Sequence, residues 1–445
     1  MTVTRKIDRR QVLKASAASV ALLGASSTRA LASPALRLPR GVRRAQDGTA
    51  KVRALMWSNS TTMDANFQKR VKSFNEAHKD QIEVELQFLP YDQYWQKLQL
   101  SYSSGDPYDI YFWDVQAYGH YKRDLLLNLQ PYVDESQVYD PATYPTELFE
   151  VWKLDGENLY ALPENLQSMA LYYNKTIFDE AGAAVPDETW TWDQVVEAAK
   201  ALTIRDGDRV SQWGLDAGVL SVWWGVQTLG WAQGDAFFDQ IVEPTKFQVS
   251  NPANVAALQF VHDLVHVHKV APNPVTQAQS QDAPLFESSR CALALQGSWN
   301  ISTYAQVEFE WGMAPLPKWG ENRVVPYWLG GWVIPKASEV ADAAFAFGRW
   351  SASDYQETMA KEHDWIPILN SARESEVMLG GMPAGFPQAM AALSSARLGD
   401  VYHRNNQQII VEAFEPNLEQ LWNGKITAEE AAKRIDDKAN ELLKA

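Results

Sequence analysis

The pattern of apolar and polar positions over residues 50–114 predicts strands separated by helices. Phe67, Val71 and Phe74 recur at the spacing of one face of a helix. In the stretch QIEVELQF every second residue is apolar, which is typical of a half-buried strand. The predicted elements are strands at 52–57, 81–88 and 108–114 with a helix between each pair, the second at about 92–103. This order favours an α/β lobe with a mainly parallel sheet.

The rest of the chain continues with elements of both types. Thr191 and Gln194 have the spacing of a capping box ahead of an apolar helical pattern. Asn251 and Pro252 suit the N-cap and the first position of another helix. Strands are predicted at 291–296 and 324–335, and helices return after Val340. The α/β pattern therefore extends through the second half of the chain.

Length and composition predict a globular protein with two lobes. The chain has 445 residues, which is more than one hydrophobic core usually organises. Hydrophobic residues make up 46% and charged residues 21%, which is typical of neither disordered nor membrane proteins. The single cysteine, Cys291, excludes an intrachain disulfide, and its apolar neighbours predict that it is buried.

Charge is distributed unevenly between the start of the chain and the remainder. The formal net charge is −15, and residues 1–32 carry a local +5, which leaves −20 on the remainder. Such a surface repels phosphate backbones, so we expect no nucleic-acid partner. An anionic ligand in one local basic pocket stays possible.

The start of the chain predicts an export signal. Arg9 and Arg10 precede an apolar stretch at 15–25 that is too short to span a bilayer, and residues 30–32 fit a cleavage site. The paired arginines and the weakly apolar stretch resemble a twin-arginine signal, and no nearby cysteine suits a lipid anchor. We predict a twin-arginine-type signal peptide over 1–32, a flexible leader over 33–48, and a periplasmic or otherwise extracytoplasmic location.

Aromatic residues recur where the predicted strands end. The chain has 18 tryptophans, and four of them follow or end strands beside Asp, Asn, Ser or Gly: Trp57, Trp113, Trp299 and Trp332. In open α/β sheets, ligands bind beyond the carboxyl ends of the strands. A sugar ring offers an apolar face to an indole and hydroxyls to amide and carboxylate groups. The pattern favours a cleft that binds a carbohydrate without reacting.

Motifs for catalysis are weak in this sequence. HDLVH at 262–266 has the histidine spacing of a zinc-protease helix, but its polar residues form the stripe expected to face water. Around Ser298, Gln296 and Asn300 occupy the positions where a nucleophile elbow needs glycines. Neither a dinucleotide-binding nor a Walker motif occurs. We expect no catalytic residue, no metal site and no cofactor, and interpret Ser298 as a helix start that presents Trp299.

Several longer motifs, taken in order, resemble one known family. They are FNEAHKDQIEVELQFLPYDQYWQKLQ, GDPYDIYFWD, ALYYNKTIFDEAG, TWTWDQVVEAAKALT, ALQFVHDLV followed by KVAPNP, LALQGSWNIS and LGGWVIPK. From about Lys51 to the C-terminus the chain resembles the extracellular solute-binding proteins of family one, the sugar-capturing components of ABC importers. The resemblance implies a two-lobed α/β fold of the type II periplasmic-binding-protein kind, with a hinge of crossing segments and the ligand in the interlobe cleft.

The resemblance also implies domain bounds, partners and site residues. Lobe one is expected to hold 49–164 and 333–368, and lobe two 165–332 and 369–445. The expected partners are a small sugar and the transmembrane subunits of an ABC importer, with the protein a monomer. The implied ligand contacts are Trp57, Asn59, Trp113, Asp114, Asn165, Gln167, Trp223, Trp224, Gly297, Ser298, Trp299, Gly331, Trp332 and Arg373.

Two alternatives to a sugar receptor stay open. A secreted glycosidase is one, because 55 acidic residues guarantee some close pairs of carboxylates. A receptor of the same fold for a polyol, a glycerol phosphate or a polyamine is the other.

Overall fold

The structure is a computed structural model that describes residues 48–58, 60–113, 115–207, 209–280, 284–363 and 365–444. The expected signal peptide, nearly all of the expected leader, Asn59 and Asp114 lie outside these residues. Within the described part of the chain, no helix has the length and apolar character that crossing a membrane requires.

The first described segment has the strand–helix order that the sequence predicts. Its elements are β1 (Ala50–Ser58), α2 (Thr61–Ala77), β2 (Ile82–Pro90), α3 (Tyr91–Ser103) and β3 (Ile110–Phe112). Ile82 and Val84 are buried on β2 while the residues between them are exposed, as the alternation requires. β1 pairs in parallel with both β2 and β3, so the parallel start of the sheet is confirmed.

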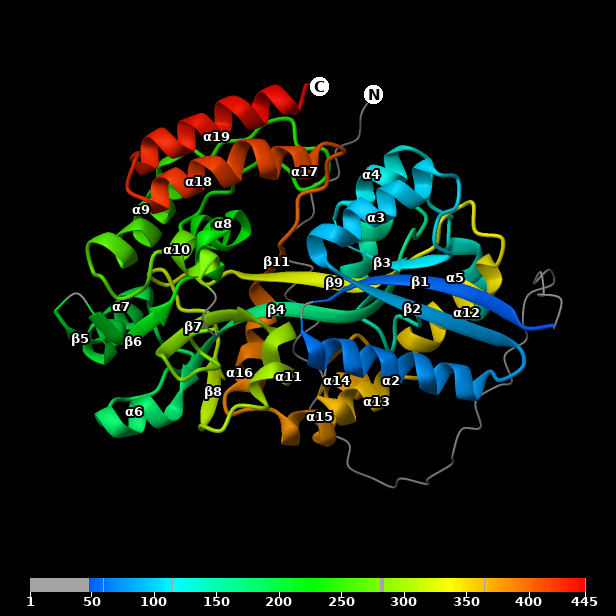
Figure 1. The fold of residues 1–445 in the computed structure, drawn as a ribbon, viewed down its shortest axis with the longest axis horizontal. Helices are drawn as coiled ribbons and strands as arrows, with labels where there is room; N and C mark the ends of the chain where they lie inside the picture. The colour runs from blue at the N-terminus through cyan, green and yellow to red at the C-terminus, as the bar shows by residue number, and fades with distance from the viewer. Residues whose placement is uncertain are drawn as a thin grey trace. The chain divides into compact units, whose positions relative to one another are not determined.

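The centre of the sheet is antiparallel, unlike its start. The long strand β4 (Leu162–Asn174) pairs with β9 (Val325–Val333) along its first half and with β7 (Cys291–Gly297) and β8 (Trp311–Ala314) along its second half. The strand order is β2-β1-β3-β9-β4-β7-β6-β5, with β5 (Ile204–Asp206) and β6 (Arg209–Asp216) at the far edge. The antiparallel pair β4 and β9 lies between the parallel part β2-β1-β3 and the part β7-β6-β5, in which β6 is parallel to β7 and antiparallel to β5 (Figure 1).

The remaining elements are helices and helical turns that flank this sheet, and two short strands that belong to it, since β10 pairs with β4 and β11 with β9 (Figure 1). Up to β9 they are α4 (Ala117–Lys122), α5 (Gln130–Ser136), η1 (Thr146–Trp152), α6 (Lys175–Ala181), α7 (Trp192–Leu202), η2 (Val219–Ser221), α8 (Trp223–Ala232), α9 (Pro252–His266), α10 (Pro274–Gln279), η3 (Ser298–Asn300) and α11 (Ile301–Tyr304). After β9 they are α12 (Ala341–Ala352), α13 (Gln356–Glu362), β10 (Ile366–Pro367), α14 (Asn370–Arg373), α15 (Glu376–Gly381), α16 (Phe386–Ala391), η4 (Ala392–Ser395), β11 (Ala396–Leu398), α17 (Asn406–Ile409), the π-helical turn η5 (Ile410–Phe414), α18 (Glu415–Trp422) and α19 (Ala428–Leu442).

Local signals explain where the central helices begin. The Thr191 hydroxyl accepts a hydrogen bond from the Gln194 backbone N–H, and the Gln194 Oε1 accepts one from the Thr191 backbone N–H. The predicted capping box of α7 is therefore confirmed. Asn251 is the N-cap residue of α9 and Pro252 occupies its first turn, although the Asn251 side chain makes no capping bond. The start of α9 is therefore favoured by the fixed φ angle of Pro252 and not by a side-chain cap.

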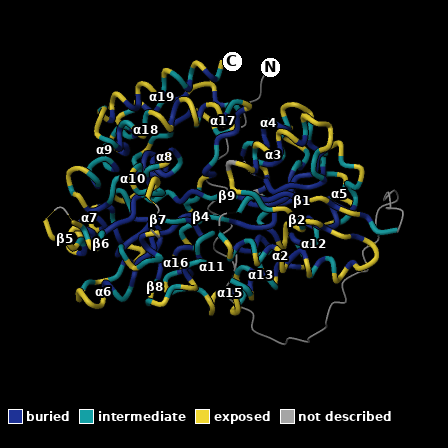
Figure 2. The backbone as a smooth tube through the Cα atoms, viewed as in Figure 1, coloured by how far each residue is buried: buried dark blue, intermediate teal, exposed yellow. Residues whose placement is uncertain are grey.

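Apolar side chains pack on both sides of the antiparallel centre. Around β7, buried residues of α7, α8, α9 and α19 form one continuous core. Near β1 and β3, Phe112 lies 5.0 Å from Trp332 and 5.4 Å from Trp365, measured between ring centroids. Cys291 is fully buried, as predicted. Figure 2 shows the central strands buried and the outer faces of the helices exposed.

Three segments run side by side near the expected lobe bounds, where the crossings from one lobe to the other would lie. β4 carries Glu164 and Asn165, β9 carries Gly331 and Trp332, and β10 pairs antiparallel with β4 opposite Asn165 and Leu166. These pairings place the predicted crossing residues in adjacent strands. The division of the remaining chain into lobes stays a prediction.

Candidate binding site

A cavity of about 370 Å³, lined mainly by aromatic side chains, lies where several strands end. We call it the aromatic cavity. It is lined by Trp57, Tyr91, Phe112, Trp113, Val115, Gln167, Trp223, Trp224, Trp299, Trp328, Leu329, Gly330, Asp400 and Ile410. Six residues from the sequence prediction line it: Trp57, Trp113, Gln167, Trp223, Trp224 and Trp299. The segments that supply them are far apart in the sequence. In the sheet, β9 and β4 are the two strands that lie between β3 and β7, so the residues that follow β3 and β7 can line one cavity.

One wall of the aromatic cavity is a cluster of three indoles. The ring centroid of Trp299 lies 5.7 Å from that of Trp328 and 6.2 Å from that of Trp224, with interplanar angles of 69° and 78°. Trp224 and Trp328 are 5.2 Å apart, also edge to face. Such edge-to-face packing favours a fixed orientation for each ring. We call these three residues the indole cluster.

The turn before Trp299 explains why the sequence reads glycine, serine, tryptophan. A Cβ atom on Gly297 would lie 2.3 Å from atoms of the Trp299 ring, so only glycine lets the indole rest on the backbone there. The Ser298 hydroxyl accepts a hydrogen bond from the Ser168 amide at 3.1 Å and is buried. A 3₁₀ turn begins at Ser298. The interpretation of Ser298 as the start of a helical turn is confirmed, and the hydroxyl joins β4 to this turn.

The facing wall comes from the first segment of the chain. Trp57 packs edge to face with Tyr91 at 5.8 Å and with Phe112 at 5.2 Å. Trp113 lies 5.2 Å from Trp152, and its backbone amide donates to the Gly331 carbonyl at 2.7 Å. The aromatic side chains of β1, α3 and β3 therefore hold one another in place.

Two polar side chains are fixed at the edge of the aromatic cavity. The Gln167 amide donates to the Asn165 Oδ1 at 3.1 Å. Asp400 accepts from the Trp328 Nε1 at 3.1 Å. The sequence analysis did not identify Trp328 and Asp400. Trp328 stands in the same strand motif as Trp332, but nothing local to Asp400 shows that it lies beside β9.

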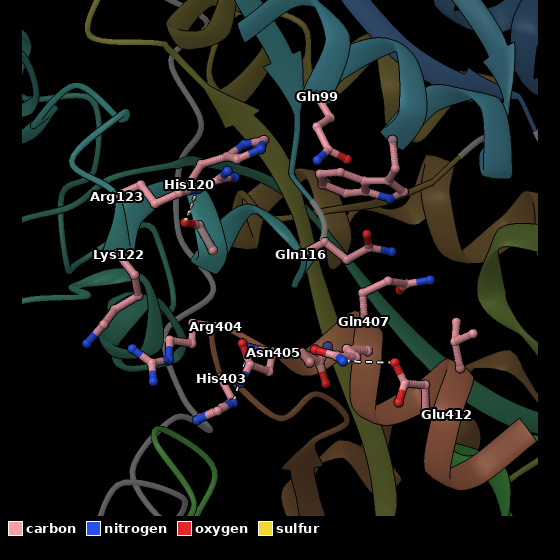
Figure 3. Close-up of a pocket in the computed structure, with 15 residues that line it drawn as sticks. Gln99, Gln116, His120, Lys122, Arg123, His403, Arg404, Asn405, Gln407 and Glu412 are labelled. Atoms are coloured by element: carbon pink, nitrogen blue, oxygen red, sulfur yellow. Dashed lines mark hydrogen bonds between the residues drawn. The ribbon is translucent and has the colours of Figure 1, made fainter. Parts of the chain in front are cut away.

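A second and larger cavity of about 680 Å³ adjoins the first, and we call it the polar cavity. Val115 and Ile410 line the aromatic cavity, while their chain neighbours Gln116 and Val411 line the polar cavity. Figure 3 shows Gln99, Gln116 and Gln407 bringing their amide groups toward the same space. The two cavities therefore differ in chemistry: aromatic rings dominate one, and amides and charged groups line the other.

A buried ion pair lies behind the aromatic cavity. Arg70 of α2 and Glu164 of β4 are both fully buried and joined through the Arg70 Nη1 and the Glu164 Oε1. The other carboxylate oxygen accepts from the Trp332 Nε1 at 2.7 Å and from the Ser351 hydroxyl. A buried charge is tolerated only with such partners. We call this group the Glu164 network.

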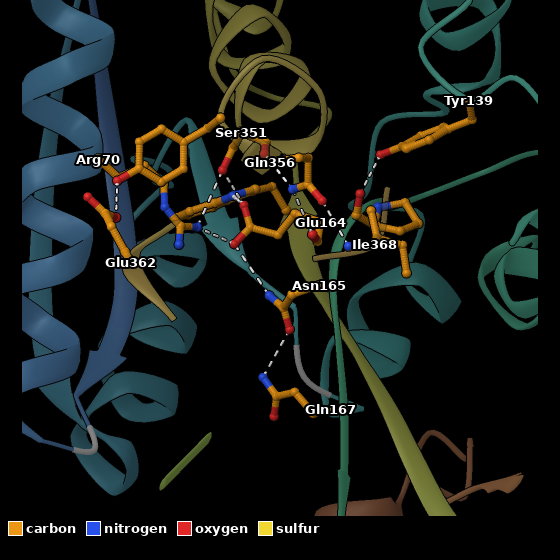
Figure 4. Close-up of polar contacts among 12 residues, drawn as sticks. Arg70, Tyr139, Glu164, Asn165, Gln167, Ser351, Gln356, Glu362 and Ile368 are labelled. Atoms are coloured by element: carbon orange, nitrogen blue, oxygen red, sulfur yellow. Dashed lines mark hydrogen bonds and ion pairs between the residues drawn. The ribbon is translucent and has the colours of Figure 1, made fainter. Parts of the chain in front are cut away.

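The Glu164 network joins the three crossing segments (Figure 4). The Gln356 side chain donates to the Glu164 carbonyl at 2.9 Å and accepts from the Ile368 amide at 2.8 Å. Asn165 donates to the Glu164 carboxylate at 3.4 Å and accepts from Gln167. A chain of hydrogen bonds thus runs from the core pair to a side chain that lines the aromatic cavity.

Several predicted contact residues lie outside the aromatic cavity. Trp332 is fully buried, and its ring centroid lies 5.1 Å from that of Phe347. Its N–H can be buried because it donates to the buried Glu164 carboxylate. This position differs from the expectation that Trp332 contacts a ligand. Gly331 lies against the Leu162 backbone. Arg373 donates to the Ile368 carbonyl and to Asn370, so in this structure it stabilises the turn after β10.

The histidine motif on α9 makes ordinary polar contacts. His262 lies 3.2 Å from Asp263, and His266 contacts the Trp422 carbonyl at 2.8 Å. Lys269, at the end of the predicted stripe, is exposed. Across the described ranges, no group of three His, Cys, Asp or Glu side chains is arranged to hold a metal ion.

The sequence model of the bacterial extracellular solute-binding proteins matches residues 57–357. The chain belongs to this family. It is therefore a solute-binding protein of extracytoplasmic location.

Similar curated proteins differ in the ligands that their names give. The arabinooligosaccharide-binding protein of Halalkalibacterium halodurans is 27% identical over 60% of this chain, and the match spans 59% of that protein. The sn-glycerol-3-phosphate-binding periplasmic protein of Rhizobium meliloti is 24% identical over 66% of this chain and 71% of its own length. The maltotriose-binding protein of Pyrococcus abyssi is 22% identical over 78% and 73%.

Solved structures with the same fold cover most of the chain. An ABC substrate-binding protein from Listeria monocytogenes in complex with cycloalternan matches with a TM-score of 0.79 and 23% identity, over 89% of this chain and 99% of that one. The maltose/maltodextrin-binding domain of Bdellovibrio bacteriovorus bound to maltotriose matches with a TM-score of 0.73 and 14% identity, over 89% and 100%. The type II two-lobed α/β fold expected from the sequence is confirmed.

Proposed function

We propose that this protein is the carbohydrate receptor of an ABC importer, which captures a mono- or oligosaccharide and delivers it to membrane subunits. The observation that carries the proposal is the aromatic cavity, in which indoles from two separate parts of the sheet face one space. Gln167 and Asp400 stand at its edge. Flat apolar surfaces with a few fixed polar groups suit a sugar, since its rings stack and its hydroxyls accept and donate hydrogen bonds.

The composition of the aromatic cavity favours an uncharged ligand over a phosphorylated one. Among its described lining residues there is no lysine or arginine. Phosphate recognition usually relies on such cations or on helix N-termini. The lack of a cationic side chain favours a sugar over a glycerol phosphate, while the first residues of α8, Trp223 and Trp224, also line the cavity. The names of two relatives give one ligand of each kind.

A binding role is favoured over hydrolysis. A glycosidase needs two carboxylates that flank the scissile bond. Asp400 is the single carboxylate among the described residues that line the aromatic cavity. Its Oδ1 accepts a hydrogen bond from the Trp328 indole N–H.

Closure of two lobes around the sugar is part of the proposal. β4, β9 and β10 are the candidate hinge, with lobe one at 49–164 and 333–368 and lobe two at 165–332 and 369–445. The Glu164 network supports this, because it fixes the three segments to one another on one side while the ends of β1, β3 and β7 face the cavity. We further propose export through a twin-arginine-type signal and function as a monomer.

A thermal-shift screen tests the proposed function. The mature protein is heated with mono-, di- and oligosaccharides, polyols, glycerol 3-phosphate and polyamines in parallel. A ligand that binds only the folded state raises the melting temperature by mass action. The proposal expects a shift with a sugar that Trp299→Ala removes. A shift with glycerol 3-phosphate or a polyamine alone would contradict it.

A further inference from the structure

One carboxylate joins two segments that the proposed bounds assign to different lobes. Glu243, in the loop between α8 and α9, accepts a hydrogen bond from the Tyr118 hydroxyl at 2.8 Å and lies 2.9 Å from the Lys122 Nζ. Tyr118 and Lys122 belong to α4 of the proposed lobe one, whereas Glu243 belongs to the proposed lobe two. Glu243 and Tyr118 line neither the aromatic nor the polar cavity. This contact is therefore separate from the candidate binding surfaces.

The backbone around Glu243 fixes the position of its carboxylate. Its φ angle is +50°, in the left-handed region that residues other than glycine rarely adopt. The Gln240 amide donates to the Glu243 carbonyl at 2.6 Å, and the Asp239 carboxylate accepts from the Thr245 N–H at 3.0 Å. A strained backbone angle of this kind persists only where the surrounding contacts hold it, and is frequent at functional sites. The turn over residues 239–245 therefore presents the carboxylate to α4.

A second segment pairs with this turn and extends the contact. Tyr402 donates its backbone N–H to the Ile241 carbonyl at 2.7 Å and accepts from the Glu243 N–H at 2.8 Å. The Tyr402 ring is 1% exposed and stacks 6.2 Å from that of Trp113, and its hydroxyl accepts from the Trp152 Nε1 at 3.3 Å. Trp113 and Trp152 belong to the proposed lobe one. We call residues 241–243 together with Tyr402 the clasp.

The clasp reaches the wall of the aromatic cavity. Trp113, which stacks on Tyr402, lines this cavity. Asp400, two residues before Tyr402, also lines it and accepts from the Trp328 Nε1. A sugar held between Trp113 and Trp328 would bridge the two proposed lobes, and the clasp bridges the same two lobes beside it. The clasp and a bound sugar would therefore favour the same arrangement of the lobes.

We propose that the clasp holds the two lobes together and slows the release of a bound sugar, although its residues line neither cavity. This inference rests on the proposed function and on the proposed lobe bounds. An isolated ion pair at the surface contributes little, but here the carboxylate acts together with a buried ring and two backbone hydrogen bonds. A contact that forms in only one of two conformations shifts the population toward that conformation.

Two variants, one on each proposed lobe, test the clasp. Glu243→Ala removes the carboxylate from lobe two, and Tyr118→Phe removes one donor from lobe one while keeping the ring. The matched control is Glu321→Ala, which removes an exposed glutamate of lobe two that lines neither cavity. The double variant of Glu243 and Tyr118 completes a cycle, in which residues that act through one contact show non-additive effects.

One readout needs no sugar. Nitroxide labels on Lys97→Cys of α3 and Lys433→Cys of α19, both exposed, report the distance between the two lobes by pulsed electron paramagnetic resonance. The native Cys291 is buried and is not expected to take a label. The second readout is the release rate of maltotriose, or of whichever screened sugar raises the melting temperature most, followed by stopped-flow tryptophan fluorescence.

Glu243→Ala and Tyr118→Phe are expected to shift the sugar-free protein toward longer distances between the labels. The loss of hydrogen bonds is expected to speed release of the sugar roughly two- to tenfold. Tyr118→Phe should add little in the Glu243→Ala background, because the acceptor is already gone. Glu321→Ala should change neither the distances nor the rate.

The outcomes separate the clasp from the proposed function. Unchanged distances, unchanged release of a sugar that does bind, or additive effects in the double variant each overturn the clasp and leave the proposed function intact. Distances that lengthen in both variants while no screened sugar binds support the clasp as a contact between lobes and contradict the proposed function. If Glu243→Ala does not fold, Tyr118→Phe alone still decides the question, since it removes a single oxygen atom.

Discussion

Two tryptophans on the same strand, Trp328 and Trp332, have opposite surroundings. Trp328 is partly exposed, lines the aromatic cavity and donates its indole N–H to Asp400. Trp332, four residues further on, is fully buried and donates to the Glu164 carboxylate. Each indole is fixed by one carboxylate, but one carboxylate stands at a cavity and the other is part of the core. The two tryptophans therefore differ in where the carboxylate that accepts from the indole N–H lies. Residue type alone does not distinguish a tryptophan at a cavity from one in the core.

This comparison predicts that the Glu164 network contributes mainly to stability. Glu164→Ala removes the carboxylate that accepts from Arg70, Trp332 and Ser351, and breaking a buried pair typically costs about 3–5 kcal/mol. The free energy of unfolding, measured with urea, is expected to fall by this amount. The matched change Glu83→Ala removes an exposed glutamate that lies 3.5 Å from Lys51, and we expect it to cost under about 1 kcal/mol. Equal costs for the two variants would refute the role of the network.

The indole cluster is predicted to act on affinity more than on stability. Stacking of a flat ligand ring on an aromatic side chain contributes about 1–3 kcal/mol where it has been measured for bases, so Trp299→Ala should weaken sugar binding by roughly 5- to 150-fold. Trp332→Ala should instead lower the free energy of unfolding by about 3–5 kcal/mol. Calorimetric titration and urea unfolding of both variants test the contrast. It fails if Trp299→Ala binds as tightly as the wild-type protein.

Asn165 is predicted to connect the two regions with a smaller effect. It is fully buried, accepts from Gln167 and donates to Glu164. Asn165→Ala frees the Gln167 side chain and removes hydrogen bonds worth about 0.5–1.5 kcal/mol each. We expect a several-fold loss of sugar affinity. In Gln167→Ala the same change at Asn165 should have little further effect on binding, because the group it orients is gone. Additive losses in the double variant would contradict this connection.

The smallest expected effect concerns Glu243, which lies in neither region. Partial burial raises the pKa of Glu243, but hydrogen bonds from Lys122 and Tyr118 outweigh it and hold the pKa below the ordinary 4.5. A carboxylate with a lowered pKa stabilises the folded state above its unfolded pKa and loses this contribution as the pH falls through the folded value. The melting temperature should therefore drop below about pH 4.5, by less in Glu243→Gln. Burial also lowers the pKa of nearby His403. The contribution of this histidine to the stability of the folded state is therefore also lost as the pH falls. Identical pH profiles for wild type and variant would exclude a role for Glu243.

Most elements could be predicted because their signals are local. The alternation in β2, the capping box of α7 and the helical turn at Ser298 depend on residues a few positions apart. The pairing of β4 with β9 depends on segments more than 150 residues apart, which one sequence does not report. The antiparallel centre of the sheet was therefore not predicted.

The candidate site was predictable to the same extent. Indoles at strand ends gave Trp57, Trp113 and Trp299, which line the aromatic cavity. The same rule placed Trp332 beside them, but a fully buried carboxylate from another strand binds its N–H. Asp400 was missed because the contact with Trp328 is made by residues 72 positions apart. Asn59 and Asp114 stay predictions, since they lie outside the described residues.

Equilibrium dialysis against an oligosaccharide series, followed by mass analysis of the retained ligand, is the most direct test of whether the aromatic cavity binds an unaltered sugar. The mature protein is expected to retain a sugar whose mass is unchanged after prolonged incubation, and Trp299→Ala is expected to retain far less of it. Recovery of shortened sugars would show an enzyme, and retention that is equal in Trp299→Ala would show that the ligand lies elsewhere.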